Sequence, residues 1–181
     1  MREIAIQDAS DSESIISRAA AGDEIACIRL VSEHYAPMVR AAYVITDDAE
    51  LAREATQVAW TKAWRRLSAL KQPERIRAWL VAIAANEARQ LVRRQHRRVI
   101  HEIAVGMPDR SNGDLSARIE VMDLKHAVRQ LSPADQGLLA MRFGAGLDSN
   151  EIGEQSGMSA SGVRSRLARL LDRLRRDLDD A

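Results

Sequence analysis

Cysteine is nearly absent from this chain of 181 residues, in which Cys27 is the only one. A single cysteine can form neither an intrachain disulfide nor a zinc site built from several thiolates. It lies in an apolar run with Ile25, Ala26 and Ile28, so we expect a buried structural thiol, with Ile25 and Ile28 at apolar core positions of the same helix. The four histidines are scattered through the sequence without the spacing of metal ligands. The sequence therefore predicts neither a metal site nor a bound cofactor.

Aromatic residues, proline and glycine are also scarce. Aromatics make up 3% of the chain, and there are only four prolines and nine glycines. Most of the 46% of residues that are hydrophobic are alanine, leucine, isoleucine or valine. This composition favours helices packed on helices over a β-sandwich or a β-barrel. We therefore predict an all-α fold.

Long hydrophobic runs are missing as well. No apolar segment approaches the roughly 20 residues that a helix needs to span a bilayer. The N-terminal residues do not form the basic and then apolar pattern of a targeting segment. We expect a cytoplasmic protein with no direct membrane insertion.

Charge is balanced overall, with a formal net charge of +1, but it is unevenly distributed. Residues 89–98 contain five arginines and no acidic residue, and residues 164–176 contain six arginines and one aspartate. Two separate basic stretches in a balanced chain indicate local contacts with anionic partners.

Hydrophobic periodicity divides the chain into two helical domains, residues 1–98 and 117–181, joined by a flexible linker at 99–116. The linker prediction rests on the turn-rich segment Met107–Asp114 and on the loss of helical spacing around it. In the first domain we expect four helices. The first begins at a capping box at Ser10–Glu13 and ends at Gly22, and the second begins at Asp23 and is broken or kinked at Pro37. The third is capped by Asp47 or Asp48, and the fourth spans about Arg75 to Arg98. In the second domain we expect helices at Ile119–Leu131, Pro133–Phe143, Ser149–Ser156 and Ser159–Asp177.

The segment Ser149–Leu170 has the spacing of a helix-turn-helix. Ile152 is expected inside, Gly153 permits close approach, and Gly157 supplies a left-handed turn above Met158. A longer helix then begins at Ser159. Its predicted inward residues are Val163, Leu167, Leu170 and Leu171. The opposite face is short or basic, which suits insertion into the major groove of DNA.

Enzymatic chemistry finds no support in the sequence. His101-Glu102 begins a zincin-like pattern, but Val105 stands where the second histidine is required. The glycines at 144 and 146 begin a dinucleotide fingerprint, but Ser149 occupies the third glycine position. No nucleophile is paired with a base, so we do not expect an enzyme.

Three segments in order resemble the extracytoplasmic-function (ECF) group of RNA polymerase sigma factors, in the sigma-70 family. The resemblance spans about residues 12–177. Its segments are EATQVAWTKAW at 54–64, IRAWLVAIAAN at 76–86, and LSPADQ at 131–136 followed by the helix-turn-helix.

This resemblance implies a role for each domain. The first domain would dock on the clamp helices of core RNA polymerase through Glu54 and Gln57. It would also bind the promoter minus-10 element through Lys71, Gln72, Arg75, Asn86, Arg89, Gln90 and Arg93. The second domain would bind the minus-35 element as duplex through Ser159, Ser161, Arg164, Ser165, Arg166 and Arg169. The resemblance also implies an anti-sigma factor as a further partner. The linker, which has three acidic residues and one arginine, would thread through polymerase.

Two alternatives remain open at the level of sequence. A stand-alone helix-turn-helix regulator would use the same second domain without polymerase, usually as a dimer on paired half-sites. An interaction protein could use its basic faces to bind an acidic protein, with binding that is insensitive to salt.

Overall fold

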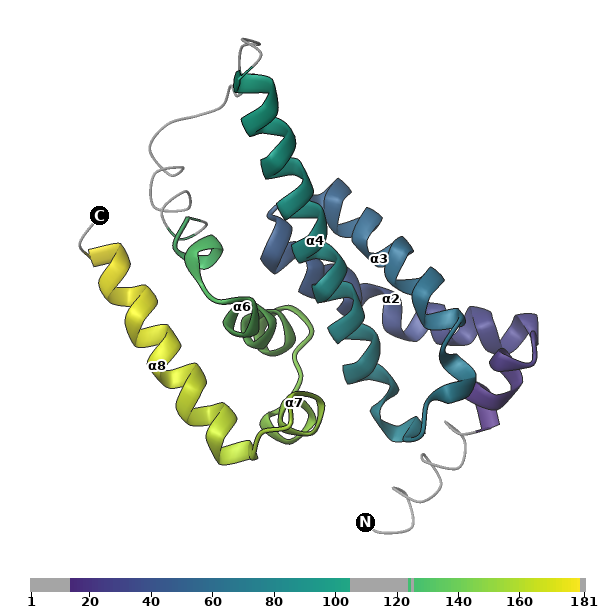
Figure 1. Cartoon of the computed structure of the whole chain (residues 1–181). Coiled ribbons are helices and arrows are strands. Elements are labelled where there is room, and N and C mark those ends of the chain that lie inside the picture. Colours follow the sequence, from purple (N-terminus) through teal and green to yellow (C-terminus); the bar gives the residue numbers. More distant parts are fainter. Residues whose placement is uncertain (1–13, 105–123, 125, 180–181) are drawn as a thin grey trace.

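The computed structural model describes residues 14–104, 124 and 126–179, and every regular element within them is helical. The first half contains a short helix at 14–20 and three long helices, α2 (Glu24–Thr46), α3 (Ala49–Trp64) and α4 (Ile76–Ala104). The second half contains a helical segment at 126–130, then α6 (Pro133–Leu139), η3 (Ala140–Gly144), α7 (Ser149–Ser156) and α8 (Ala160–Asp179). The predicted all-α fold in two helical halves is confirmed (Figure 1).

Helix α2 begins where the sequence predicted, because the side chain of Asp23 accepts a hydrogen bond from the backbone N–H of Ala26. Of the break or kink predicted at Pro37, the break is wrong, since the helix continues through the proline to Thr46. Buried residues on both sides of the proline, Leu30 before it and Met38 after it, hold one continuous face against the core. Tertiary packing thus outweighs the local cost of proline within the helix.

The N-terminal turn of α2 corrects a second expectation. Ile25 and Ile28 were predicted as apolar core positions, but they are 74% and 60% exposed. Ala26 and Leu30 are buried instead, at 3% exposed each. The prediction of a buried thiol is therefore wrong, because Cys27 is only half-buried. Its Sγ lies 3.7 Å from the carbonyl oxygen of Ala19.

Small side chains let α3 lie close to its neighbours. Its inner face contains four fully buried alanines, at positions 52, 55, 59 and 63. Trp60, which is 7% exposed, stacks on Trp64 with ring centroids 5.0 Å apart. Asp48 caps the helix through the backbone N–H groups of Glu50 and Leu51. The first half is thus a compact three-helix unit with a short N-terminal helix.

Helix α4 extends further than the sequence indicated. It reaches Ala104, beyond the predicted end near Arg98, so the first six residues of the predicted linker are helical. The rest of that linker, the capping box at Ser10–Glu13 and the start of the helix predicted from Ile119 lie outside the described residues.

The second half follows its predicted start and stop signals closely. Ser132 caps α6 with Pro133 in its first turn, and Asp148 and Glu151 form a capping box on α7. The helix predicted to continue to Phe143 changes character at Ala140, where it becomes a π-helix that ends at Gly144. Single-turn π-helices are frequent at functional sites.

His34 lies inside the first half, 5% exposed, and its Nδ1 has no hydrogen-bond partner within the described residues. Burial lowers the pKa of His34 below the ordinary value of 6.5, and the charge of Arg77 adds to this while Glu33 opposes it. The unfolded chain therefore binds this proton more readily than the folded one, so stability falls as pH drops below 6.5.

Chemical denaturation between about pH 7.5 and 5.5 should show this loss, with a slope of at most about 1.4 kcal/mol per pH unit from one proton. A His34→Gln variant should lose that part of the slope. An unchanged slope in the variant would assign the effect to other groups.

None of the helices in the described part of the chain is both long enough and apolar enough to cross a membrane.

Candidate nucleic-acid interface

The helix-turn-helix predicted from the sequence is present. Ile152 is fully buried beneath the turn, and Gly157 adopts the left-handed conformation with φ of 70°. A Cβ atom on Gly153 would lie 2.6 Å from the carbonyl oxygen of Met158, and the Met158 N–H donates to the Gly153 carbonyl oxygen at 2.9 Å. Glycine at 153 is therefore what allows the chain to turn back so tightly onto α7.

Helix α8 packs through one narrow stripe. Val163, Leu167, Leu170 and Leu174 are buried on it. Leu171 was predicted to point inward, but it is 38% exposed. The steps of four, three and four residues keep one face on the core, and Leu171 lies about 100° around the helix from Leu170, at the edge of that face.

The opposite face of α8 carries most of the predicted minus-35 residues. Ser161, Arg164, Ser165 and Arg169 are all exposed there. Ser159 precedes the helix, and its Oγ accepts a hydrogen bond from the Gly162 N–H at 3.1 Å, which makes it a capping residue. Helix α8 lies on the outer side of the second half, with α6 and α7 between it and α4 (Figure 1).

Arg166 differs from its neighbours because it is held within the second half. Its Nε donates to Asp135 Oδ1 at 2.8 Å, and Ser132 Oγ donates to the other oxygen of the same carboxylate at 2.7 Å. Burial alone would raise the pKa of Asp135, but the hydrogen bonds from Ser132 and Arg166 outweigh it and lower the pKa. This contact fixes α8 against the start of α6.

The predicted minus-10 residues fall into two groups. Lys71 and Gln72 are exposed in the loop before α4, and Arg75 ends the short 3-10 helix η2 (Pro73–Arg75). Four others form a stripe along α4, since their spacing of three and four residues puts them on one helical face. They are Asn86, Arg89, Gln90 and Arg93.

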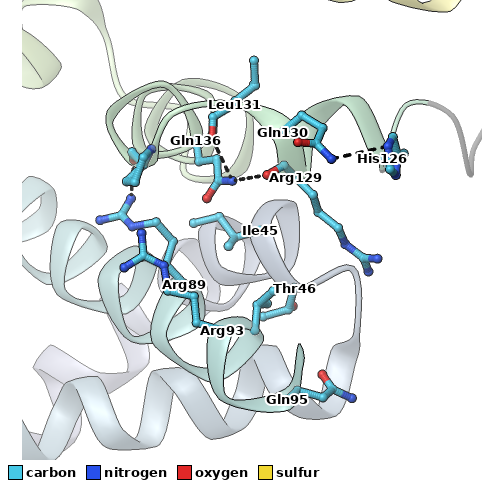
Figure 2. Close-up of a pocket in the computed structure, with 12 residues that line it drawn as sticks. Ile45, Thr46, Arg89, Arg93, Gln95, His126, Arg129, Gln130, Leu131 and Gln136 are labelled. Carbon is cyan, nitrogen blue, oxygen red and sulfur yellow. Dashed lines mark hydrogen bonds between the residues drawn. The ribbon is translucent and has the colours of Figure 1, made fainter. Parts of the chain in front are cut away.

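Arginines from both halves line a groove of about 620 Å³ (Figure 2). Arg89 and Arg93 of α4 line one side and Arg129 the other, with Ile45 between them. No acidic residue is among the described residues that line it. Burial and the charge of Arg93 lower the pKa of Arg89, as expected where cations crowd together. The groove can attract an anion.

Arg129 is a candidate that sequence reasoning missed. It lies in neither of the basic stretches, and only the packing of the two halves brings it opposite α4. The segment that contains Arg129 is stabilised by Gln136, whose side-chain amide donates to the carbonyl oxygens of Val128, Arg129 and Leu131 at 3.2–3.3 Å. Because Arg129 is an isolated arginine, no pattern in the sequence indicates that it lies opposite α4.

The predicted polymerase contacts, Glu54 and Gln57, lie one turn apart on the outer face of α3 and are both exposed. The opposite face of this helix is the buried alanine stripe. The structure thus leaves the outer face open to a partner.

The two halves match two regions of one family. Residues 30–98 match sigma-70 region 2 and residues 127–176 match sigma-70 region 4, in that order. The chain belongs to the sigma-70 family. More specifically, it belongs to the ECF group of sigma factors, the proteins that direct RNA polymerase to promoters.

Individual relatives agree with this. The chain is 28% identical to the ECF RNA polymerase sigma factor SigL of Mycobacterium tuberculosis, over 91% of this chain and 96% of that protein. It is 29% identical to the probable RNA polymerase sigma factor RfaY of Xanthomonas campestris pv. campestris, over 90% of this chain but only 43% of that longer protein. The fold resembles CnrH, solved in complex with the cytosolic domain of CnrY, with a TM-score of 0.66, 23% identity, and coverage of 92% of this chain and 96% of that one.

The sigma region 2 match separates the two DNA-binding hypotheses. A stand-alone regulator needs only the helix-turn-helix, whereas this chain devotes its first half to the region that is typical of sigma factors. The stand-alone reading is therefore not favoured.

Proposed function

We propose that this sigma factor binds core RNA polymerase in the cytoplasm and starts transcription at promoters whose minus-10 and minus-35 elements are bound by its first and second halves. The observation that carries the proposal is the exposed serine and arginine face of α8, which projects from a buried helix-turn-helix core. Core polymerase, and not this chain, would perform the chemistry.

At the minus-35 element, α8 would enter the major groove. Its N-terminal serines are short enough to let the helix approach the bases, and Arg164 and Arg169 can bind guanine or phosphate. Arg166 would act by positioning, because its guanidinium is bonded to Asp135.

At the minus-10 element, the loop residues Lys71 and Gln72 and the polar stripe of α4 would hold unpaired DNA. Proteins bind single strands through a basic groove that follows the backbone and through pockets for extruded bases. Arg89 and Arg93 of α4 line a groove that has no acidic residue among its described lining residues, and this supports the proposal.

Glu54 and Gln57 would dock on the clamp helices of polymerase through the open face of α3. The fold also resembles the sigma factor RpoE from Bartonella quintana, solved in complex with the anti-sigma factor NepR, and this supports an anti-sigma factor as a partner of this chain.

Run-off transcription with purified core polymerase on genomic fragments tests the function. We expect transcripts with a defined start only when the chain and core polymerase are both present. A chain that binds core polymerase no better than an unrelated basic protein would sink the proposal, and a palindromic footprint without core would favour the stand-alone regulator.

Arg164→Ala should weaken binding to one promoter selectively, by about 1–3 kcal/mol, if the guanidinium contacts a base. Arg175→Ala is the matched control, since this exposed arginine lies on the same helix outside the predicted set. Fluorescence anisotropy with minus-35 duplexes that differ by single base pairs gives the measurement. Equal weakening across all duplexes would assign Arg164 to phosphate.

A further inference from the structure

Gln90 lies in the middle of the polar stripe on α4, with Asn86 one turn before it and Arg93 about one turn after it. Both neighbours are exposed, whereas Gln90 is partly buried. Its side chain contacts a charged group of the protein, since Gln90 Nε2 lies 3.4 Å from Glu87 Oε1. The stripe proposed to hold the minus-10 element is therefore joined at Gln90 to the interior of the first half.

Glu87 is held in place by a second helix. Its side chain is only 5% exposed, and its Oε1 accepts a hydrogen bond from Lys62 Nζ of α3 at 2.6 Å. Lys62 and Gln90 thus bond to the same oxygen atom from two helices that pack on each other. A carboxylate with an ammonium at this distance makes a strong, charge-assisted bond, which restricts the directions in which the glutamate can turn.

The carboxylate decides which end of the Gln90 amide faces outward. A glutamine amide has a donor end, Nε2, and an acceptor end, Oε1, whereas an ionised carboxylate only accepts. Turning the amide over would place two acceptor oxygens against each other. The bond is long and weak at 3.4 Å, so the sign of the charge and not the strength of the bond fixes the orientation. Gln90 Oε1 therefore faces away from Glu87, and it accepts no hydrogen bond from the residues that the structure describes.

The bases of DNA differ in what they offer to such an acceptor. Adenine N6 and cytosine N4 are amino donors on the major-groove edge, where guanine and thymine carry a carbonyl oxygen. We propose that Glu87 is a positioning residue that makes Gln90 present its acceptor oxygen to the minus-10 element, so that Gln90 selects adenine or cytosine at the position it contacts. This inference rests on the proposed function, which supplies the contact between Gln90 and the minus-10 element.

The expected effect follows from one hydrogen bond made or opposed. Gln90 Oε1 gains a bond from an amino group, whereas a carbonyl oxygen at the same place leaves two acceptors unpaired against each other. A difference of this kind corresponds to about tenfold in affinity. Without the charge of Glu87 the amide is free to turn over, so either end can face the base and the discrimination is lost.

Glu87→Gln tests the inference in the holoenzyme assembled from the full chain and core polymerase. The new amide has the size of the glutamate and can still accept from Lys62, but it can match either end of Gln90. Glu50→Gln, at an exposed carboxylate in the first turn of α3, is the matched control. The probe is a promoter fragment recovered by run-off transcription, with its minus-10 positions randomised. Sequencing of the bound fraction gives the relative affinity for each base at each position.

We expect the unchanged chain to prefer adenine or cytosine over guanine and thymine by about tenfold at one minus-10 position. Glu87→Gln should reduce this preference to about twofold or less there and leave the other positions unchanged, whereas the control should retain it. A purely structural role of Glu87 would instead weaken binding to all sequences alike, which would overturn the inference.

Base analogues give a second measurement that does not depend on the folding of any variant. Purine in place of adenine lacks the N6 amino group, and uracil in place of cytosine carries an oxygen where the N4 amino group stood. Whichever analogue applies should lower the affinity of the unchanged holoenzyme about tenfold at the same position. Equal binding of the base and its analogue would overturn the inference.

Gln90→Ala separates failure of this inference from failure of the proposed function. If Gln90→Ala abolishes the preference at one position but Glu87→Gln leaves it intact, or if the preferred base is guanine or thymine, Glu87 does not set the amide and only the inference is wrong. If Gln90→Ala changes the preference at no position, the minus-10 assignment of Gln90 is wrong and the inference falls with it. An absence of defined transcripts would contradict the proposed function itself.

Discussion

Replacing Gly153 with valine is expected to destabilise the second half by about 3 kcal/mol and to abolish binding to minus-35 duplex. The Cβ of any side chain at 153 would meet the carbonyl oxygen of Met158 at 2.6 Å, and valine adds two methyl groups to that collision. Overpacking of a well-packed site costs about 1–3 kcal/mol, and this site lies at the upper end because the obstacle is backbone. The turn would open and α8 would lose its position.

Gly162→Val provides the matched control for stability. Gly162 is also helical, but a Cβ there meets only side-chain atoms, Ser159 Oγ at 3.1 Å and Met158 Cε at 3.8 Å. These can move, so we expect a change of less than about 1 kcal/mol. Thermal unfolding by circular dichroism compares the two variants, and equal loss in both would refute the proposed tight turn.

Lys62→Met should destabilise the first half by about 3 kcal/mol. Lys62 Nζ lies 2.6 Å from Glu87 Oε1, and the glutamate side chain is only 5% exposed. Removing the lysine leaves a carboxylate buried with a single weak donor, the side-chain amide of Gln90 at 3.4 Å. Breaking a buried pair costs about 3–5 kcal/mol, and the lower value applies because Lys62 is 44% exposed.

A second change should reverse most of that loss. Lys62→Met combined with Glu87→Leu removes both charges, and an apolar pair of similar size is often neutral or better. Lys71→Met, at an exposed lysine of the loop, controls for loss of positive charge. Urea denaturation gives the free energies. If the double variant is as unstable as Lys62→Met, the buried carboxylate is not the cause.

Features that depend only on neighbouring residues were predicted correctly from the sequence. Asp23, Ser132 and Gly157 act where the pattern predicted, because a cap or a left-handed turn involves only residues within one helical turn. The inward position of Ile152 follows from the same short-range periodicity.

The expectations that proved wrong depend on contacts between distant segments. Pro37 is accommodated because the buried residues Leu30 and Met38 hold α2 against the core on both sides of it, and Ile25 is exposed because no described element covers its side of the first turn. The bonds from Arg40 and Arg77 to the second half also left no trace in the sequence, since a backbone carbonyl can be offered by any residue. The proposed DNA-binding and polymerase-binding residues stay predictions.

The stacked pair Trp60 and Trp64 has a practical consequence. The remaining tryptophan is Trp79, so all three indole rings lie in the sigma region 2 half, and none in the region 4 half. Intrinsic tryptophan fluorescence will therefore report unfolding of the region 2 half only. A thermal transition that changes far-ultraviolet ellipticity without shifting the tryptophan emission wavelength would belong to the half that carries the helix-turn-helix.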